Sequence, residues 1–232
     1  MLFRSHGATS IMEYRQMGYL PDALVNFLAL MGWAPSGDRE ILPIKELIKE
    51  FTLEKVNKTS AIFNIDKLNW LNGQYLKEKG SKELLDILAP LLVESGIIGE
   101  DFDREKLLRL VELYKVRMKT LADFVGYVKV FYNDKIDRDP EAVKKHLENE
   151  KSKTNLIEWR RRLAKTASFD KDSIEENCRS TAAELHIKPA ELIHPARVAI
   201  SGTTAGAGLF EMMEILGKET VFRRIDEATG TS

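Results

Sequence analysis

The sequence is poor in residues that build disulfides and metal centres. It has one cysteine, Cys178, and four histidines that stand far apart, at positions 6, 146, 186 and 194. A single thiol excludes an internal disulfide and a multi-thiolate zinc site, and the scattered histidines form no i,i+4 pair, so we expect no metal site. We interpret the histidines as solvated or hydrogen-bonded side chains and Cys178 as a small buried hydrophobe rather than a nucleophile. Cysteine usage favours a reducing compartment, and the expected location is cytoplasmic.

An excess of charge and a long apolar run are also lacking. The 35 Lys and Arg residues stand against 36 Asp and Glu residues, which gives a net charge of −1. This balance argues against a uniformly basic nucleic-acid binder but leaves room for a local basic face. Without a signal peptide or an apolar run of about eighteen residues, neither secretion nor membrane insertion is expected. With 232 residues, 44% of them hydrophobic, the chain can hold one large domain or two small ones.

Strand patterns and glycine-rich phosphate loops are scarce as well. No strand alternation exceeds a few residues, and no glycine-rich loop lies between a strand and a helix. The βαβ signature of a nucleotide-binding core is therefore missing. What the sequence contains instead is a succession of amphipathic helix patterns with clear starts and stops, so we predict an all-α fold.

The most apolar stretch runs from Tyr19 to Trp33 and predicts a buried helix. A proline stands near its start, where a missing N–H costs nothing, and Gly32 suits a left-handed exit. At about a dozen residues this helix is too short to span a bilayer, which takes roughly 20. Just upstream, Ser10 and Glu13 form a capping box, and Gly18 is expected to end the helix that they begin.

The motifs around these two helices carry a resemblance to a known family. They are His6-Gly7-Ala8, Glu13-Tyr14-Arg15, Met17-Gly18-Tyr19-Leu20-Pro21 and Leu28-Ala29-Leu30-Met31-Gly32-Trp33. Together they resemble bacterial glutamyl-tRNA synthetase immediately after its KMSKS-type loop. Two further clusters follow in the family's order, at positions 61–72 and 195–219, so the resemblance runs from His6 to about Ala228.

The resemblance implies an elongated array of helical bundles that binds RNA. Residues 1–80 would form a stem-contact-like domain, and residues 81–138 and 139–232 two anticodon-binding helical subdomains. The implied partner is tRNA(Glu), with no DNA and no membrane, and a monomer is expected. The chain would be the anticodon-recognising C-terminal portion of an enzyme that joins glutamate to tRNA with ATP. Whether that enzyme also charges tRNA(Gln) stays open, apart from the hint that Arg117 gives.

The first five residues occupy the place of the family's Lys-x-Ser-Lys-Arg loop. Only Arg4 and Ser5 are interpreted as its remnant, and Met1 stands in place of the first lysine. In the family these lysines stabilise ATP phosphates during glutamate activation, which requires fixed cationic groups. We therefore expect no catalytic residue, no cofactor in this chain and no activity of the chain alone, while ATP and Mg²⁺ would belong to the full-length enzyme. A start placed inside a longer protein accounts for the broken loop.

The resemblance also implies contacts with the anticodon. Arg117 and Lys119 lie at a corner between two helix patterns, and discriminating members of the family place an arginine at this point to read the third anticodon base. That base is C for glutamate and G for glutamine, and a guanidinium offers several donors to a base edge. Arg197 and Leu209 match family positions that approach the anticodon, and Thr204 lies in the loop between them. Arg117 and Arg197 are expected to frame one surface.

A second set of contacts is implied for the inner tRNA stem. Lys67, Asn69 and Asn72 are expected to be exposed there, although a solvated helix face explains them equally well. Trp70 and Leu71 are expected in the core.

Further along, Pro90 should kink or restart a helix, and Asp139 should begin one. A third helix is expected to start with a capping box from Ser173 to Glu176. The stretch from Lys144 to Lys165 is strongly basic, either as a charged helix face or as a phosphate-tracking surface.

Two other functions stay open. The chain could be a stand-alone helical module that binds tRNA or protein without a synthetase role. Alternatively, it could itself be active, which the missing ATP site opposes.

Overall fold

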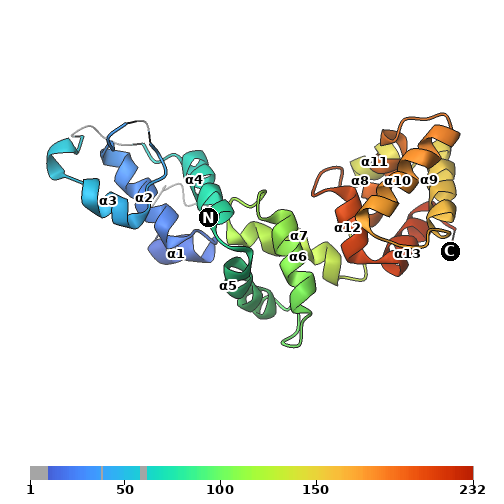
Figure 1. Cartoon of the computed structure of the whole chain (residues 1–232), viewed down its shortest axis with the longest axis horizontal. Coiled ribbons are helices and arrows are strands. Elements are labelled where there is room, and N and C mark those ends of the chain that lie inside the picture. Colours follow the sequence, from blue (N-terminus) through green and yellow to red (C-terminus); the bar gives the residue numbers. More distant parts are fainter. Residues whose placement is uncertain (1–9, 38, 58–61, 232) are drawn as a thin grey trace, which may run out of the picture. The chain divides into compact units, whose positions relative to one another are not determined.

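The computed structural model describes residues 10–37, 39–57 and 62–231 (Figure 1). Within them, regular structure consists of thirteen α-helices and one short 3-10 helix, and a single isolated bridge pairs Trp33 with Val56. The predicted all-α fold is confirmed. No helix in this part of the chain is long and apolar enough to cross a membrane. Arg4 and Ser5, the expected loop remnant, lie outside the described residues.

The chain divides into two compact units, residues 1–128 (unit 1) and 129–232 (unit 2), and the division falls within α7. The three-part division expected at residues 80 and 138 stays a prediction. The elements up to α7 are α1 (Ile11–Gln16), α2 (Pro21–Gly32), α3 (Ile44–Glu50), η1 (Leu53–Lys55), α4 (Ile65–Glu78), α5 (Ser81–Glu94), α6 (Arg104–Tyr114) and α7 (Leu121–Tyr132). Those after it are α8 (Pro140–His146), α9 (Glu150–Leu163), α10 (Lys171–Glu184), α11 (Ala190–Ser201), α12 (Leu209–Leu216) and α13 (Lys218–Thr229).

Unit 1 is built around the packing of α2 on α4. Tyr19, Leu24 and Phe27 meet Leu68 and Leu71 in one core cluster. The predicted capping box at the start of α1 is present, and a glycine in the left-handed region follows that helix as expected. The two helices therefore meet at a tight corner, residues 17–20, which we call the α1–α2 corner.

Two details of the predicted helices in unit 1 were wrong. Val25 and Leu28 on α2 are more than 40% exposed, so this helix has an outer face despite its apolar sequence. Gly32 stays helical, and Trp33 ends α2 in an extended conformation, because its indole is drawn into a second cluster with Leu42. Pro90 lies inside an uninterrupted α5, so the helix does not restart there, and a kink at this residue stays a prediction.

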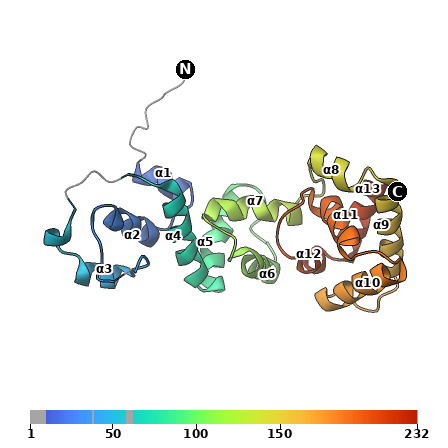
Figure 2. The same cartoon turned by 90° about the horizontal axis from the view of Figure 1, so that it is seen from above.

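In unit 2, α9, α11 and α13 pack against one another and carry α8, α10 and α12 around them (Figures 1 and 2). Trp159 of α9 is fully buried in this core. Cys178 is also fully buried, and its burial raises the pKa of the thiol to about 12, so it is the inert hydrophobe that was predicted. Asp139 caps α8 as predicted.

One boundary in unit 2 differs from the prediction. The side chain of Asp170 accepts the N–H of Ser173, so α10 begins two residues before the proposed capping box. Here an earlier cap overrides the local motif. Pro195 lies inside α11, which continues through it as a helix.

Candidate nucleic-acid interface

The corner between α6 and α7, residues 115–120, is a rigid base for exposed cations; we call it the α6–α7 corner. Met118 anchors it in the core, and the carboxylate of Asp123 accepts the N–H groups of Lys119 (2.8 Å) and Thr120 (2.9 Å). Arg117 and Lys119 point outward from this base and are exposed. Arg117 donates only a local hydrogen bond, 3.1 Å, to the carbonyl of Leu113 among the contacts described. The predicted exposure of Arg117 at a helix corner is confirmed.

A hollow of about 330 Å³ separates this corner from α4. Trp70, Lys77, Arg117 and Lys119 line it, together with amide side chains of α4. Trp70 is 43% exposed, so the prediction that it lies in the core was wrong, whereas Leu71 is fully buried as expected. Neighbouring residues of a helix face different ways, and only Leu71 faces α2. The hollow thus combines an aromatic ring with cations and amide groups.

The three residues expected on the tRNA stem are engaged inside unit 1. Lys67 pairs with Glu40 at 2.6 Å, and Asn69 accepts a hydrogen bond from the hydroxyl of Tyr19 at 2.6 Å. Asn72 is fully buried, so the prediction that it is exposed was wrong. Its side chain bonds to backbone groups of two different segments, which is the reason that the position turns inward.

The loop between α11 and α12, residues 202–208, is the second candidate surface; we call it the α11–α12 loop. Gly202 ends α11 at φ 78°, and a Cβ at this position would overlap the carbonyl oxygen of Asp137. The N–H of Asp139 donates to the Gly202 carbonyl at 2.9 Å. Residues 203–206, which include Thr204, are exposed as the resemblance implies. The small side chains of this loop leave its backbone open to a ligand.

The two other residues expected at this surface support the loop instead. Arg197 is partly buried and donates to the carbonyl of Ala207 at 2.8 Å. Leu209 is 3% exposed, and the contact with RNA that the resemblance implies for this residue stays a prediction. It is the first residue of α12, whose apolar face, with Met212 and Met213, packs into the core of unit 2.

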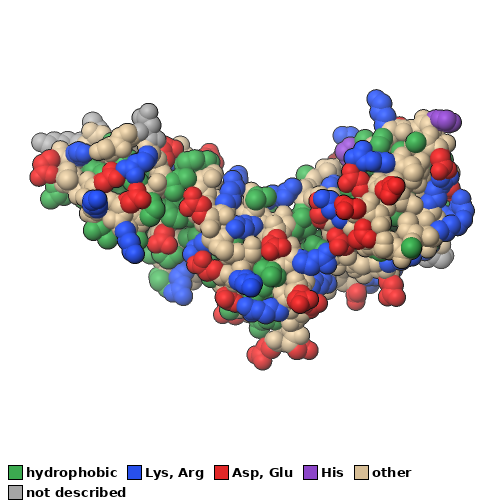
Figure 3. Space-filling view, in the orientation of Figure 1, with side chains coloured by type: hydrophobic (Ala, Val, Ile, Leu, Met, Phe, Trp, Pro, Cys, Tyr) green, Lys and Arg blue, Asp and Glu red, His purple; other side chains and the backbone are tan. Residues whose placement is uncertain are grey.

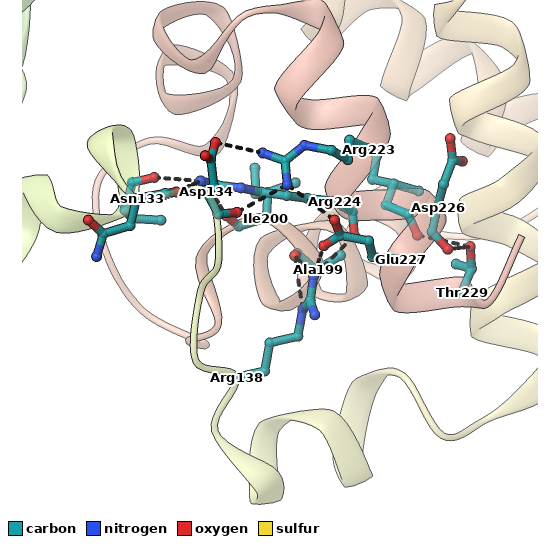
Figure 4. A network of polar contacts seen from close by, with 12 residues as sticks. Asn133, Asp134, Arg138, Ala199, Ile200, Arg223, Arg224, Asp226, Glu227 and Thr229 are labelled. Atoms are coloured by element: carbon teal, nitrogen blue, oxygen red, sulfur yellow. Dashed lines mark hydrogen bonds and ion pairs between the residues drawn. The ribbon is translucent and has the colours of Figure 1, made fainter. Parts of the chain in front are cut away.

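A network of arginines fixes the base of this loop (Figure 4). Arg224 of α13 is 1% exposed and donates to the carbonyls of Ile200, Val130 and Asn133, each at 2.8 Å. Burial lowers the pKa of its guanidinium below the usual value. Arg138 donates to the carbonyl of Ala199 at 3.0 Å. Cations on carbonyls at a helix end are favourable, and here they hold the last turns of α7 and α11.

The three arginines in the basic stretch of α9 are paired within the protein. Arg160 makes two hydrogen bonds to Asp226, at 3.0 and 2.7 Å. Arg161 and Arg162 both bind Glu158, and these hydrogen bonds lower the pKa of its carboxyl to about 2. This pairing supports the interpretation of the stretch as a charged helix face rather than a phosphate-tracking surface. Across the described residues, no group of three or more metal-ligating side chains is placed to hold a metal ion.

Comparison with known proteins adds two family matches. Residues 74–229 match the family described as the anticodon binding domain. Residues 4–70 match the family described as tRNA synthetases class I (E and Q), catalytic domain. The α6–α7 corner and the α11–α12 loop both fall in the first match.

Among curated proteins, a glutamate--tRNA ligase of Moorella thermoacetica is 40% identical over 230 residues, which cover 98% of this chain and 47% of that protein. Glutamate--tRNA ligase 2 of Thermoanaerobacter pseudethanolicus is 40% identical over 98% of this chain and 47% of its own length. The chain thus spans about half the length of the curated relatives it matches. A crystal structure of a glutamate tRNA ligase from Elizabethkingia meningosepticum, in complex with its amino acid, has a TM-score of 0.84 at 30% identity over 94% of this chain and 42% of that one.

Proposed function

Because this chain belongs to the glutamate--tRNA ligase family and contains its anticodon-binding domain, we propose that it binds the anticodon arm of tRNA(Glu). The observation that carries the proposal is the hollow beside the α6–α7 corner. Within it an exposed aromatic ring, Trp70, lies beside the exposed cations Arg117 and Lys119. These are the groups that single-stranded nucleic acid requires: a surface for stacking and positive charge for its backbone.

Each group in the hollow has a distinct role in this proposal. Arg117 reads the edge of the third anticodon base, because a guanidinium presents donors in a fixed fork. Trp70 stacks on an unpaired base, and Lys119 contacts a phosphate, which contributes to affinity but not to selectivity. Thr204 and the backbone of the α11–α12 loop supply a second contact from unit 2. That Arg117 and Arg197 frame one surface stays a prediction.

In this proposal, joining glutamate to tRNA with ATP and Mg²⁺ is the activity of the longer ligase, and this chain supplies RNA recognition. The exposed apolar side chains between residues 11 and 70 support that division, because they lie in the part that matches the catalytic-domain family. We propose that this apolar face packs against the remainder of such a catalytic domain. The proposed setting is the cytoplasm, and the proposed RNA-binding chain is a monomer.

Fluorescence anisotropy with labelled tRNA(Glu) tests the RNA-binding function, with the same tRNA lacking its anticodon arm as the control ligand. We expect binding of the intact tRNA to weaken at least tenfold between about 50 and 200 mM salt, because phosphate contacts release counterions. The shortened tRNA should bind much more weakly at either salt concentration. Equal binding of both ligands would contradict anticodon recognition, and no binding of either would favour a protein-binding helical module.

A further inference from the structure

The buried side chain of Asn72 joins two corners of unit 1 that are far apart in the sequence. Its Oδ1 accepts the N–H of Leu20 at 2.8 Å, in the α1–α2 corner. Its Nδ2 donates to the carbonyl of Lys119 at 2.5 Å, in the α6–α7 corner. Asn72 is fully buried, so neither bond has water as a ready substitute.

The first residues of α7, which continue the α6–α7 corner, also touch the α1–α2 corner directly, and α4 touches the α6–α7 corner. The N–H of Leu121 donates to the carbonyl of Gly18 at 2.9 Å. A Cβ on Gly18 would come within 2.7 Å of the backbone nitrogen of Ala122, and one on Gly73 within 3.3 Å of the carbonyl oxygen of Met118. The segments are therefore packed backbone to backbone, so a shift of the α6–α7 corner moves the α1–α2 corner with it.

Asn72 lies at the boundary between two family matches in the sequence. It lies between the stretch that matches the class I catalytic-domain family, residues 4–70, and the stretch that matches the anticodon binding domain, residues 74–229. The α1–α2 corner belongs to the first stretch and the α6–α7 corner to the second.

We propose that Asn72 is a positioning residue that couples these two corners, so that RNA held by Arg117 and Lys119 restrains the α1–α2 corner. This inference rests on the proposed function of the α6–α7 corner. It assigns to Asn72 a role in transmitting RNA binding, where the sequence pattern had suggested a direct contact with the tRNA stem.

A neutral amide suits this bridge, because it accepts from Leu20 and donates to Lys119 without any change of protonation. Asn72→Asp keeps the shape and the acceptor, and in its ionised form it lacks the donor. Asn26 offers a matched control in the same unit: it is fully buried, and its Oδ1 accepts the N–H of Leu42 and the hydroxyl of Tyr75, both at 2.8 Å. Its Nδ2 has no hydrogen-bond partner among the described residues, so Asn26→Asp places an equal buried charge without breaking a donated bond.

The test measures single-residue amide exchange by NMR on the ¹⁵N-labelled chain, with and without an RNA stem-loop of the tRNA(Glu) anticodon arm. The Leu20 amide reports on the bridge, and the Leu42 amide, bonded to Asn26, is the internal reference in the same unit. We expect RNA to slow Leu20 exchange relative to Leu42 by at least fivefold, about the lower end of the coupling between two linked sites. This slowing of Leu20 exchange by RNA, relative to Leu42, should persist in Asn26→Asp. In Asn72→Asp it should disappear, so that the slowing of Leu20 divided by that of Leu42 falls to about one.

The outcomes separate this inference from the proposed function. If the wild-type chain binds the RNA and the Leu20 ratio does not change, the coupling is wrong while the RNA-binding function stands; this measurement needs no variant to fold. If Asn72→Asp retains the RNA-dependent ratio, Asn72 does not carry the coupling. If the wild-type chain binds no RNA, the proposed function fails and the coupling to RNA fails with it. A pure loss of stability changes Leu20 and Leu42 together and leaves their ratio unaltered.

Discussion

The two units differ in how completely they bury their apolar residues. Among the residues that the structure describes, sixteen large hydrophobic side chains are exposed; all lie in unit 1, and fourteen of them fall between residues 11 and 70. The described residues of unit 2 contain none at this level of exposure. In Figure 3, hydrophobic side chains gather over α1 and α2, whereas the visible face of unit 2 is mostly charged or polar. Large exposed apolar faces mark surfaces that contact another molecule.

The difference indicates two kinds of stability. Unit 2 covers its core with its own helices and satisfies helix ends with the buried guanidinium of Arg224. The 11–70 part of unit 1 keeps an uncovered face on α2 and α3, where Leu28 is 47% and Ile48 71% exposed. Unit 2 should therefore depend on internal polar contacts, and unit 1 on a partner surface.

The largest expected effect is in unit 2. Arg224→Met leaves one buried and two part-buried carbonyl oxygens without this donor, and a buried unpaired group costs about 1–3 kcal/mol, so the free energy of unfolding of unit 2 should fall by about 3 kcal/mol. The buried Cys178 thiol, reactive only when unit 2 opens, reports this in urea titrations with a thiol reagent. The control Arg161→Met removes an exposed ion pair with Glu158 and should cost less than about 1 kcal/mol. If the two variants lower the free energy of unfolding equally, unit 2 does not depend on the buried polar contacts of Arg224, and the proposed difference between the units is wrong.

The second effect concerns the apolar face of unit 1. Ile48→Lys should leave the folding of this chain within about 0.5 kcal/mol of wild type, because the side chain is exposed. It should weaken association with the separately expressed N-terminal part of the Moorella thermoacetica ligase by about 1.5–3 kcal/mol, the contribution of one buried isoleucine. Calorimetry measures both, and Val116→Lys, exposed but outside residues 11–70, is the matched control. If Ile48→Lys leaves the affinity for the N-terminal part unchanged, the partner does not bind the apolar face that contains Ile48.

A third effect tests the hollow beside α4. Trp70→Ala should weaken binding of an anticodon-arm RNA by about 1–3 kcal/mol through lost stacking, while Trp70→Phe should retain most of the affinity. Trp33→Phe, at a buried tryptophan in the same unit, should leave RNA affinity unchanged. Anisotropy at fixed salt measures the three variants. An unaltered affinity in Trp70→Ala would return this residue to a purely structural role.

The smallest expected effect is a pH dependence in unit 2. His146 stacks on His194 at 5.3 Å, and burial, followed by the charges of His194 and Lys145, lowers its pKa in the folded chain. In the unfolded chain the pKa of this imidazole is about 6.5, so the unfolded chain takes up a proton at a higher pH than the folded chain does. The stability of unit 2 should therefore decrease slightly as pH falls through about 6.5. Urea titrations from pH 7.5 to 5 should show a shallower slope in His146→Gln. An identical slope would assign the dependence to other groups.

The helix starts could be predicted from the sequence because a cap is a local hydrogen bond. Ser10 and Asp139 each bond to an N–H within three residues, and both do so as predicted. The exposure of Arg117 followed similarly from its place between two helix patterns. The family resemblance supplied what periodicity lacks, namely the proposal that the α6–α7 corner faces RNA.

The misses share a different physical cause. Trp70 and Asn72 lie at helix positions whose side depends on which other helix packs there, and this is not encoded within a few residues. Asn72 turns inward because Leu20 and Lys119, remote in sequence, both need a partner. Arg224 was missed for the same reason: its three acceptors come from two distant segments, and its own neighbours read as an ordinary amphipathic helix.

The central claim, that the α6–α7 corner reads the anticodon, is tested most directly by one ratio. It is the ratio of dissociation constants for two anticodon-arm RNAs that differ only in the third anticodon base, C or G, at one fixed salt concentration. Arg117→Gln should bring this ratio closer to one by roughly 5- to 150-fold, because a base-edge contact is lost. This change corresponds to about 1–3 kcal/mol of discrimination between the two RNAs. Lys119→Gln should weaken both RNAs equally and leave the ratio as in the wild type, as a phosphate contact requires. A ratio that Arg117→Gln leaves unchanged would contradict the account and assign Arg117 no part in recognition.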